Sequence, residues 1–147
     1  MPRETHVQWF IVEAANKPGE LARHADAIAK RGINLAGVVS LAIGERGGAA
    51  FYATDETGLR TALNDAGIAY REVSAVTASI EDKPGTVAAA TRLLGDAGVN
   101  IQLFAPVGMD DKKFKVAIGV DNVEAARKAL GKLVTESPTS AMAGTPR

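Results

Sequence analysis

Two short segments of the chain alternate between apolar and more polar positions with a period of two, which predicts a β-strand in each. They are residues 7–13 and 73–79. The positions that would face a core match in register, with Phe10, Val12 and Ala14 in the first and Val76, Ala78 and Ile80 in the second. The same strand pattern therefore occurs once in each half of the chain.

After each strand, the apolar spacing changes to that of an α-helix with one face on a core. The positions on that face are Leu21, Ala25 and Ile28 in the first half and Val87, Thr91 and Leu94 in the second. Gly32 and Gly98 stand where a left-handed C-terminal cap would end each helix.

Further strands and a second helix complete each half. The predicted strands are residues 35–43, 49–54 and 70–73 in the first half and residues 101–109, 114–120 and 134–136 in the second, with turns at 44–47 and 110–113. The second helices are marked by Leu59, Ala62, Leu63 and Ala66, and by Ala126, Leu130 and Leu133.

These elements predict an α+β protein made of two ferredoxin-like βαββαβ units packed side by side, with antiparallel sheets and helices on one face. The units would span residues 5–73 and 74–136. Residues 137–147 are rich in Ser, Thr, Pro, Gly and Ala, which is typical of a flexible tail.

An internal repeat supports this division of the chain. Residues 17–19 read Lys-Pro-Gly and recur at residues 83–85, and the Gly-x-Asn group ending at Asn34 recurs at Asn100, each at an offset of 66. The second helices match at an offset of 67, so we infer a one-residue insertion near Asp121.

Composition narrows the classes of function. The 17 basic and 17 acidic residues balance, which argues against a general nucleic-acid binder and a membrane-surface protein. No stretch is apolar enough to cross a bilayer. The absence of cysteine excludes disulfides and thiolate chemistry. Together with a polar N-terminus, it favours a cytoplasmic protein.

The Pro-Gly pairs point to ligand chemistry. Proline and glycine at the start of a helix would leave the N–H groups of residues 19–21 and 85–87 at the positive end of the helix dipole, which favours an anion such as a carboxylate. Asn34 and Asn100 could bind the ammonium and carboxylate groups of an amino acid. A purely structural turn is the alternative interpretation.

These motifs resemble those of the ACT-domain family, whose pattern is D-x-P-G-x-L followed by G-x-N-I. The second copy fits closely from Asp82 onward, with Val87 for the usual Leu, whereas Asn16 replaces the acidic residue in the first copy. The resemblance covers residues 6–136 and implies a stand-alone tandem of regulatory domains.

The resemblance further implies a non-catalytic amino-acid sensor, with ligand held at the interface between the Pro-Gly loops. The residues expected to bind ligand are Asn16, Pro18, Gly19, Glu20, Leu21, Asn34, Asp82, Pro84, Gly85, Thr86, Val87 and Asn100. We expect no cofactor, and an amino-acid metabolic enzyme or regulator as partner. The acidic residue makes the loop of residues 82–87 the better predicted site. The alternative is a protein-interaction module without a small-molecule ligand.

Other chemistry finds little support in the residues. His24 is expected to be a solvated helix residue, Ser40 has no His and Asp partner pattern, and Asp110–Asp111 is typical of a turn. We therefore predict no catalytic and no metal-binding residue. The low aromatic content, 5%, argues against RNA recognition on the sheet.

Trp9 and Ile11 would lie on the face of the first strand that no helix covers. An exposed apolar patch of this kind usually marks a contact, so we predict a homodimer formed partly through these two residues. The alternative is that Trp9 is a core residue.

Overall fold

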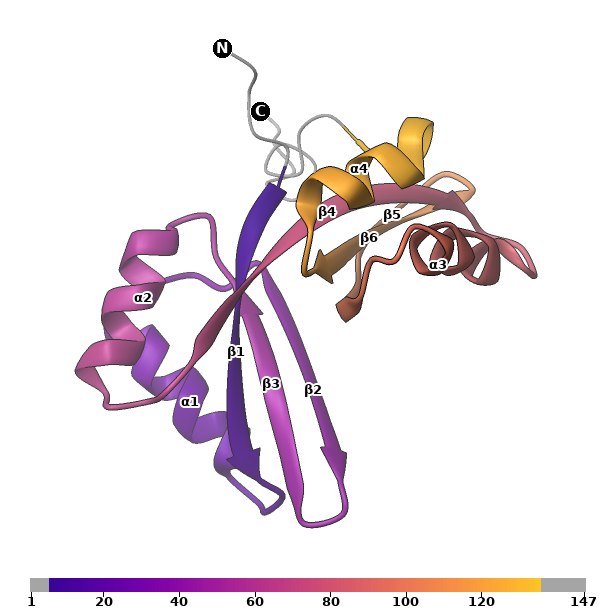
Figure 1. Ribbon diagram of the computed structural model, residues 1–147. Helices are drawn as coiled ribbons and strands as arrows, with labels where there is room; N and C mark the ends of the chain where they lie inside the picture. The colour runs from indigo at the N-terminus through magenta and orange to yellow at the C-terminus, as the bar shows by residue number, and fades with distance from the viewer. Residues whose placement is uncertain (1–5, 136–147) are drawn as a thin grey trace. The chain divides into compact units, whose positions relative to one another are not determined.

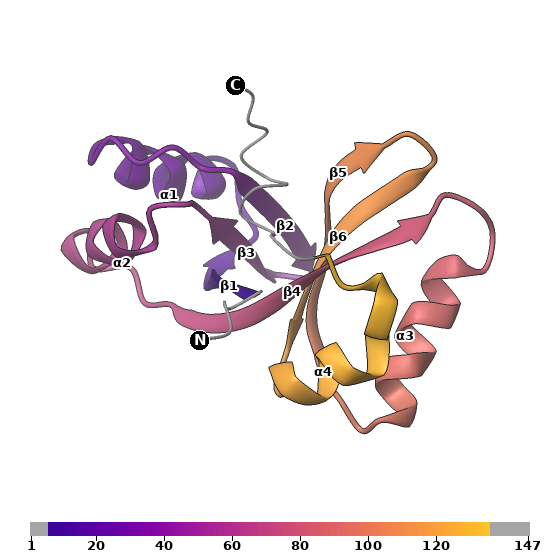
Figure 2. The same cartoon turned by 90° about the horizontal axis from the view of Figure 1, so that it is seen from above.

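The computed structural model describes residues 6–135. They divide into two compact units. The first unit contains Gln8–Glu72, and the second contains Val73 onward together with His6 and Val7. Each unit is an antiparallel sheet with two helices on one face, so the predicted α+β class with ferredoxin-like units is confirmed (Figures 1 and 2).

The elements of the first unit follow the predicted order. They are β1 (His6–Ala15), α1 (Glu20–Ala29), β2 (Gly37–Ile43), β3 (Arg46–Tyr52) and α2 (Glu56–Asp65). The strands lie in the order β2-β3-β1, and both pairings are antiparallel. β2 is therefore an edge of this sheet.

The second unit repeats this arrangement. Its elements are β4 (Arg71–Glu81), α3 (Thr86–Asp96), β5 (Ile101–Asp110), β6 (Lys113–Val120), α4 (Val123–Leu130) and a 3₁₀ turn, Gly131–Leu133. The strand order is β4-β6-β5, again antiparallel.

The last strand of each predicted βαββαβ unit differs from the prediction. Residues 71–73 are the beginning of the long strand β4 rather than a separate strand. In the second unit, the expected strand is a single bridge between Ala78 and Val134, extended by a 2.9 Å hydrogen bond from the Thr135 N–H to the Thr77 carbonyl. Residue 136 and the predicted tail, 137–147, lie outside the described residues.

Each unit has a core between its sheet and its helices. The predicted core positions of the first strand, Phe10 and Val12, pack with Ile28 of α1 and Leu59 of α2. The corresponding positions of β4, Val76, Ala78 and Ile80, pack in the second core with Ala90, Leu94, Ala126 and Leu130. Five of the six predicted core positions therefore lie in a core, and the sixth, Ala14, is half-buried.

The faces of the first helices are only partly as predicted. Ile28 and Leu94 are buried, but Leu21 and Val87, in the first turns of their helices, are 40% and 47% exposed. His24 is buried, so the prediction of a solvated side chain was wrong. It lies four residues before Ile28, and residues four apart share a helix face.

Trp9 is also buried, and the prediction that it forms an exposed patch was wrong. Its ring stacks on Tyr52, with 5.8 Å between the ring centroids. A Cβ atom added to Gly37 would lie 2.6 Å from the indole, so Trp9 needs glycine beside it. Ile11 is half-buried. The alternative that Trp9 is a core residue is therefore correct.

The one-residue insertion lies in β5 rather than near Asp121. Phe104 occupies the place of Val38 at an offset of 66, whereas Asp110 occupies the place of Ile43 at an offset of 67. The pairing register of β5 shifts between Pro106 and Gly108, so a β-bulge takes up the extra residue.

Candidate functional site

The two Pro-Gly loops have the same backbone geometry. Gly19 precedes α1 with φ 87°, and Gly85 precedes α3 with φ 90°. This left-handed conformation costs glycine little and other residues more, which explains the glycine at both positions. A 3.4 Å hydrogen bond closes each loop, from Glu20 N–H to the Lys17 carbonyl and from Thr86 N–H to the Lys83 carbonyl.

Neither glycine is capped by a side chain. Within residues 6–135, no acceptor is found for the N–H groups of Gly19, Leu21, Gly85 or Val87. The predicted donors at the start of each helix are therefore available, except that Glu20 and Thr86 already donate to their own loops. The positive end of each helix dipole adds to the attraction for an anion.

Asn16 and Asp82 anchor the loops to the neighbouring hairpins. The Asn16 N–H donates to the Glu45 carbonyl at 3.0 Å, and the Asp82 N–H donates to the Lys112 carbonyl at 2.8 Å. The Asn16 amide also donates to the Gly44 carbonyl at 2.9 Å, a bond that an aspartate could not make. The departure from the acidic residue thus has a structural effect in the first unit.

The first residues of the two helices differ. In α3 the Thr86 hydroxyl donates to the carbonyls of Glu81 and Lys83, at 2.7 and 3.0 Å, and so turns back into the loop. In α1 the Glu20 carboxylate accepts two hydrogen bonds from the Arg23 guanidinium, at 2.9 and 3.4 Å. The first loop therefore carries a negative charge where the second carries a hydroxyl.

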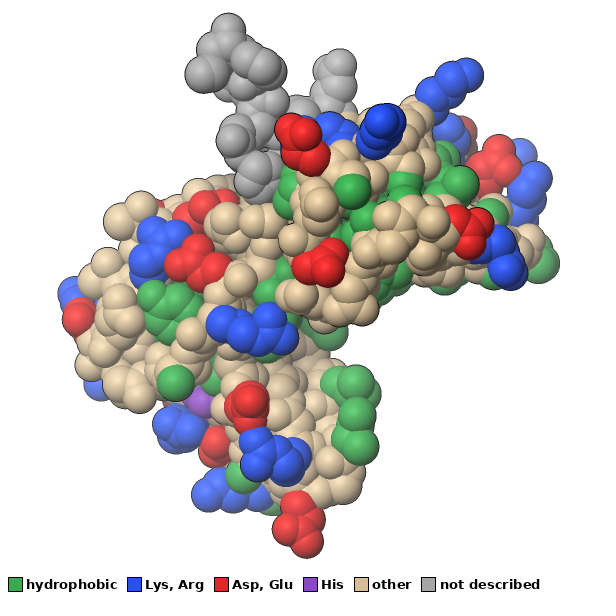
Figure 3. All heavy atoms as spheres, viewed as in Figure 1, with side chains coloured by type: hydrophobic (Ala, Val, Ile, Leu, Met, Phe, Trp, Pro, Cys, Tyr) green, Lys and Arg blue, Asp and Glu red, His purple; other side chains and the backbone are tan. Residues whose placement is uncertain are grey.

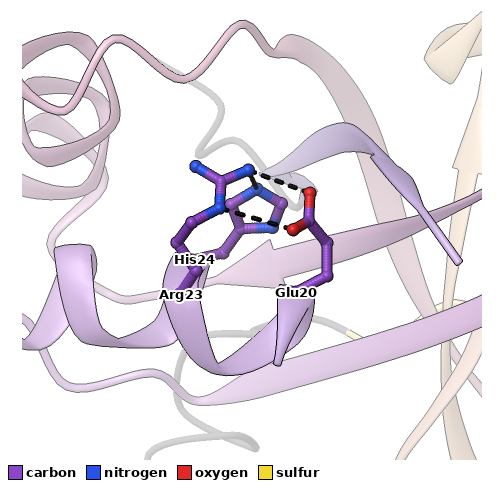
Figure 4. Close-up of polar contacts among 3 residues, drawn as sticks. All are labelled: Glu20, Arg23 and His24. Carbon is purple, nitrogen blue, oxygen red and sulfur yellow. Dashed lines mark hydrogen bonds and ion pairs between the residues drawn. The ribbon is translucent and has the colours of Figure 1, made fainter. Parts of the chain in front are cut away.

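Glu20, Arg23 and His24 form one polar cluster on α1 (Figure 4). The hydrogen bond from Arg23 lowers the pKa of the Glu20 carboxyl below its usual value. Burial is the main cause that lowers the pKa of His24, and the nearby Arg23 charge lowers it further. At neutral pH the cluster thus holds an ionised Glu20 beside a neutral imidazole.

A small cavity, which we call the loop cavity, opens beside this cluster and has a volume of about 110 Å³. Its wall includes Asn16, Glu20, Leu21, His24 and Ser40, together with other residues of β2 and β3. A cavity of this size suits a small metabolite rather than a nucleotide. The loop cavity brings three predicted site residues, Asn16, Glu20 and Leu21, together with His24, which was not predicted from the sequence.

The other predicted residues are placed differently. Pro18 and Gly19 belong to the same loop without lining the loop cavity, and Asn34 is exposed away from its wall. Asp82, Pro84, Gly85 and Val87 are exposed in the second loop, and Thr86 is half-buried. The Asn100 N–H donates to the Asp121 carboxylate at 3.0 Å, so its backbone joins two segments of the second unit.

A larger cavity of the first unit is also lined by His24. This lateral cavity, about 530 Å³, is lined by Ile11, Arg23, His24, Tyr70 and neighbouring residues of β1 and the segment 67–71. His24 therefore contributes to the walls of two cavities in the first unit.

Neither a metal-ligand cluster nor a membrane-spanning helix is found in the described part of the chain. Residues 6–135 contain no group of three or more potential metal-ligating side chains close enough to hold an ion. No helix among them is both long and apolar enough to span a membrane.

Comparisons with known proteins identify the fold. No family model matches the chain, and no curated protein matches it significantly. A protein from Bacteroides thetaiotaomicron has a similar structure with a TM-score of 0.76 at 22% identity, covering 96% of this chain and 98% of its own.

Two regulatory subunits of aspartate kinase are also similar. The ligand-free subunit from Thermus thermophilus has a TM-score of 0.60 at 22% identity, covering 88% of this chain and 92% of its own. The subunit from Thermus flavus has a TM-score of 0.60 at 19% identity, covering 89% and 94%. At these identities the comparisons show a shared fold, and function must be argued from the site.

Proposed function

We propose that this chain is a non-catalytic, amino-acid-binding regulatory protein whose ligands bind at the Pro-Gly loops. The observation that carries the proposal is the duplicated helix start, where a left-handed glycine leaves uncapped N–H groups in both units. These donors suit an α-carboxylate. The ionised Glu20 in the wall of the loop cavity suits the ammonium group of the same ligand.

The second loop offers the same groups in a more open setting. Asp82 belongs to the same loop as the uncapped N–H groups of Gly85 and Val87, and its carboxylate has no hydrogen bond or ion pair among the described residues. It is thus available for an ammonium group. We keep the sequence-based prediction that this loop binds the amino acid more tightly than the first.

The shared fold adds support for a regulatory role. Two of the similar structures are named as regulatory subunits of aspartate kinase. By analogy, we propose that this chain transmits the presence of an amino acid to an enzyme or regulator of amino-acid metabolism, without catalysis of its own.

Titration calorimetry of the full chain against the twenty amino acids tests this proposal. We expect saturable binding of at least one amino acid, and a weaker affinity when Glu20→Gln or Asp82→Asn removes a carboxylate from one loop. Asp96→Asn, at the end of α3, is the matched control that should change nothing. If no amino acid binds at millimolar concentration, the proposal is wrong.

A protein-interaction module is the second candidate, and one observation favours it. Leu41 and Ile43 of the edge strand β2 are 67% and 76% exposed, and hydrophobic side chains are visible at the surface over this hairpin (Figure 3). Exposed edge strands can pair with another chain. The predicted homodimer would then use β2 instead of Trp9. Sedimentation of Leu41→Lys against wild type tests this, since the substitution should dissociate such a dimer without unfolding it.

A further inference from the structure

His24 occupies a position in the first unit that does not require a polar residue. The corresponding residue of the second unit is Ala90, and each of the two residues is only 1% exposed. Each lies four residues before a buried apolar residue, Ile28 or Leu94, in a unit of the same architecture. An imidazole here is therefore not needed to form the fold.

The hydrogen bonds of His24 define its tautomer. Its Nε2 atom lies 3.2 Å from Nη2 of Arg23. A guanidinium can only donate, so Nε2 must accept, and a neutral imidazole then carries its proton on Nδ1. That N–H group is buried and has no hydrogen-bond partner. Because buried donors nearly always have partners, an unsatisfied one suggests a partner that binds from outside.

The position of the ring limits where such a partner could bind. His24 lines the loop cavity together with Glu20, Leu21 and Ser40. The χ2 angle of a histidine side chain has a broad distribution, so a modest rotation of the ring can present Nδ1–H to a molecule in this cavity. The T-shaped contact of His24 with Phe51, at 6.5 Å between ring centroids, supports the ring from the core side.

We propose that His24 determines the ligand specificity of the loop cavity by donating its Nδ1–H to the side chain of the bound amino acid. This inference rests on the proposed amino-acid binding. The ligand class it specifies is a small amino acid whose side chain ends in a neutral acceptor, such as a hydroxyl or an amide. The loop of the second unit, with Ala90 at this position, lacks that selectivity.

The charges around the cavity orient the backbone groups of such a ligand. The ionised Glu20, which is paired with Arg23, attracts the α-ammonium group. The Lys17 ammonium on the same wall and the helix N-terminus attract the α-carboxylate. His24 is then left to read the side chain, because a site that offers an unpaired polar group discriminates against analogues that cannot pair with it.

Isosteric ligand pairs test the inference on the full chain. Serine against alanine, and threonine against valine, differ by one hydroxyl in each case. We expect calorimetry on a background of Asp82→Asn, which weakens the second site, to show at least tenfold tighter binding of the hydroxylated member. His24→Ala and the volume-preserving His24→Leu should reduce this ratio to about twofold or less while alanine still binds.

Two further variants distinguish the two cavities that His24 lines. Leu21→Phe narrows the loop cavity, and Ala69→Phe narrows the lateral cavity. The proposal expects only Leu21→Phe to weaken serine binding. The reverse result would place the ligand elsewhere and overturn it.

The outcomes separate the two proposals. If wild type binds amino acids but the serine-to-alanine ratio survives both His24 substitutions, the role of His24 is wrong and amino-acid binding stands. If wild type binds none of the four amino acids or any of the other sixteen, amino-acid binding itself is wrong. Circular dichroism confirms that each variant is folded.

Discussion

The first turns of α1 and α3 start from glycines with nearly the same φ angle, 87° and 90°, but they are followed by different side chains. In the first unit Glu20 and His24 belong to a polar cluster around Arg23. In the second unit Thr86 closes its own loop, and Ala90 is an apolar residue of the core. The two units thus share a backbone and differ in the chemistry placed on it.

The helix-free faces of the sheets differ in the same way. The first unit combines the large Trp9 with a small Gly37, whereas the matching positions of the second unit are Ala75 and Leu103. There, a Cβ atom on Gly119 would lie 3.0 Å from Leu103 and 2.7 Å from Val73. Each face balances large residues against small ones, so the residues cannot be exchanged singly between the units.

The largest expected effect comes from removing the residue that most distinguishes the first unit. Trp9→Ala should lower the free energy of unfolding by about 3–5 kcal/mol, because it opens a cavity in a fully buried, stacked site. Urea denaturation measures the loss. Ala75→Gly in the second unit is the matched control and should cost about 1 kcal/mol. A Trp9 variant that keeps its stability but loses an oligomer would restore the view of Trp9 as an exposed contact.

A second expected effect depends on pH and on His24. Burial lowers the pKa of His24 in the folded state, so below about pH 6.5 the unfolded chain binds a proton that the folded chain does not. The stabilising contribution is complete above that pH and is lost as pH falls through the lowered pKa. Wild type should therefore lose stability between pH 7.5 and 5 more steeply than His24→Leu.

The slope of the unfolding free energy against pH should differ between wild type and His24→Leu by no more than about 1.4 kcal/mol per pH unit, which is the limit for the binding of one proton. His6 is present in both and cancels. Parallel pH profiles for wild type and His24→Leu would contradict a buried, neutral His24.

The smallest expected effect concerns a glycine within a helix. Gly95 of α3 has open space where a Cβ atom would be, and Ala29 is its counterpart in α1. Gly95→Ala should raise the free energy of unfolding by about 0.5–1 kcal/mol, and Ala29→Gly should lower it by a similar amount. Thermal unfolding of both variants measures the pair. Changes of the same sign would show that the two helices are not equivalent in this respect.

Sequence periodicity predicted the strands and helices well because each strand has one face on a core. Phe10 and Val12, and Val76 and Ala78, were assigned to the correct faces. The glycines at 32 and 98 were correctly expected to adopt left-handed conformations, since the apolar pattern ends just before them. These features depend on local rules that a single sequence displays.

The errors concern what covers a surface, which periodicity does not show. Trp9 lies on the face without helices, and its burial depends on partners such as Tyr52 that are distant in sequence. His24 was placed away from the predicted apolar face of the helix, although its spacing of four residues to Ile28, a member of that face, already placed it inward. The sequence therefore predicted a candidate site at the Pro-Gly loop but did not reveal the buried donor beside it.

One unit is a single chain segment and the other is made of two, which affects the order in which they can fold during synthesis. The first unit is one continuous segment, Gln8–Glu72, so it is synthesised before the second unit from Val73 onward. The second unit also needs Val7, the buried residue at the start of β1, which precedes it by more than sixty residues. Its completion must therefore close a loop around a region that can already be folded, and the entropic cost of such a loop rises only slowly with its length. Synthesis in this order would let the first unit fold before this loop is closed.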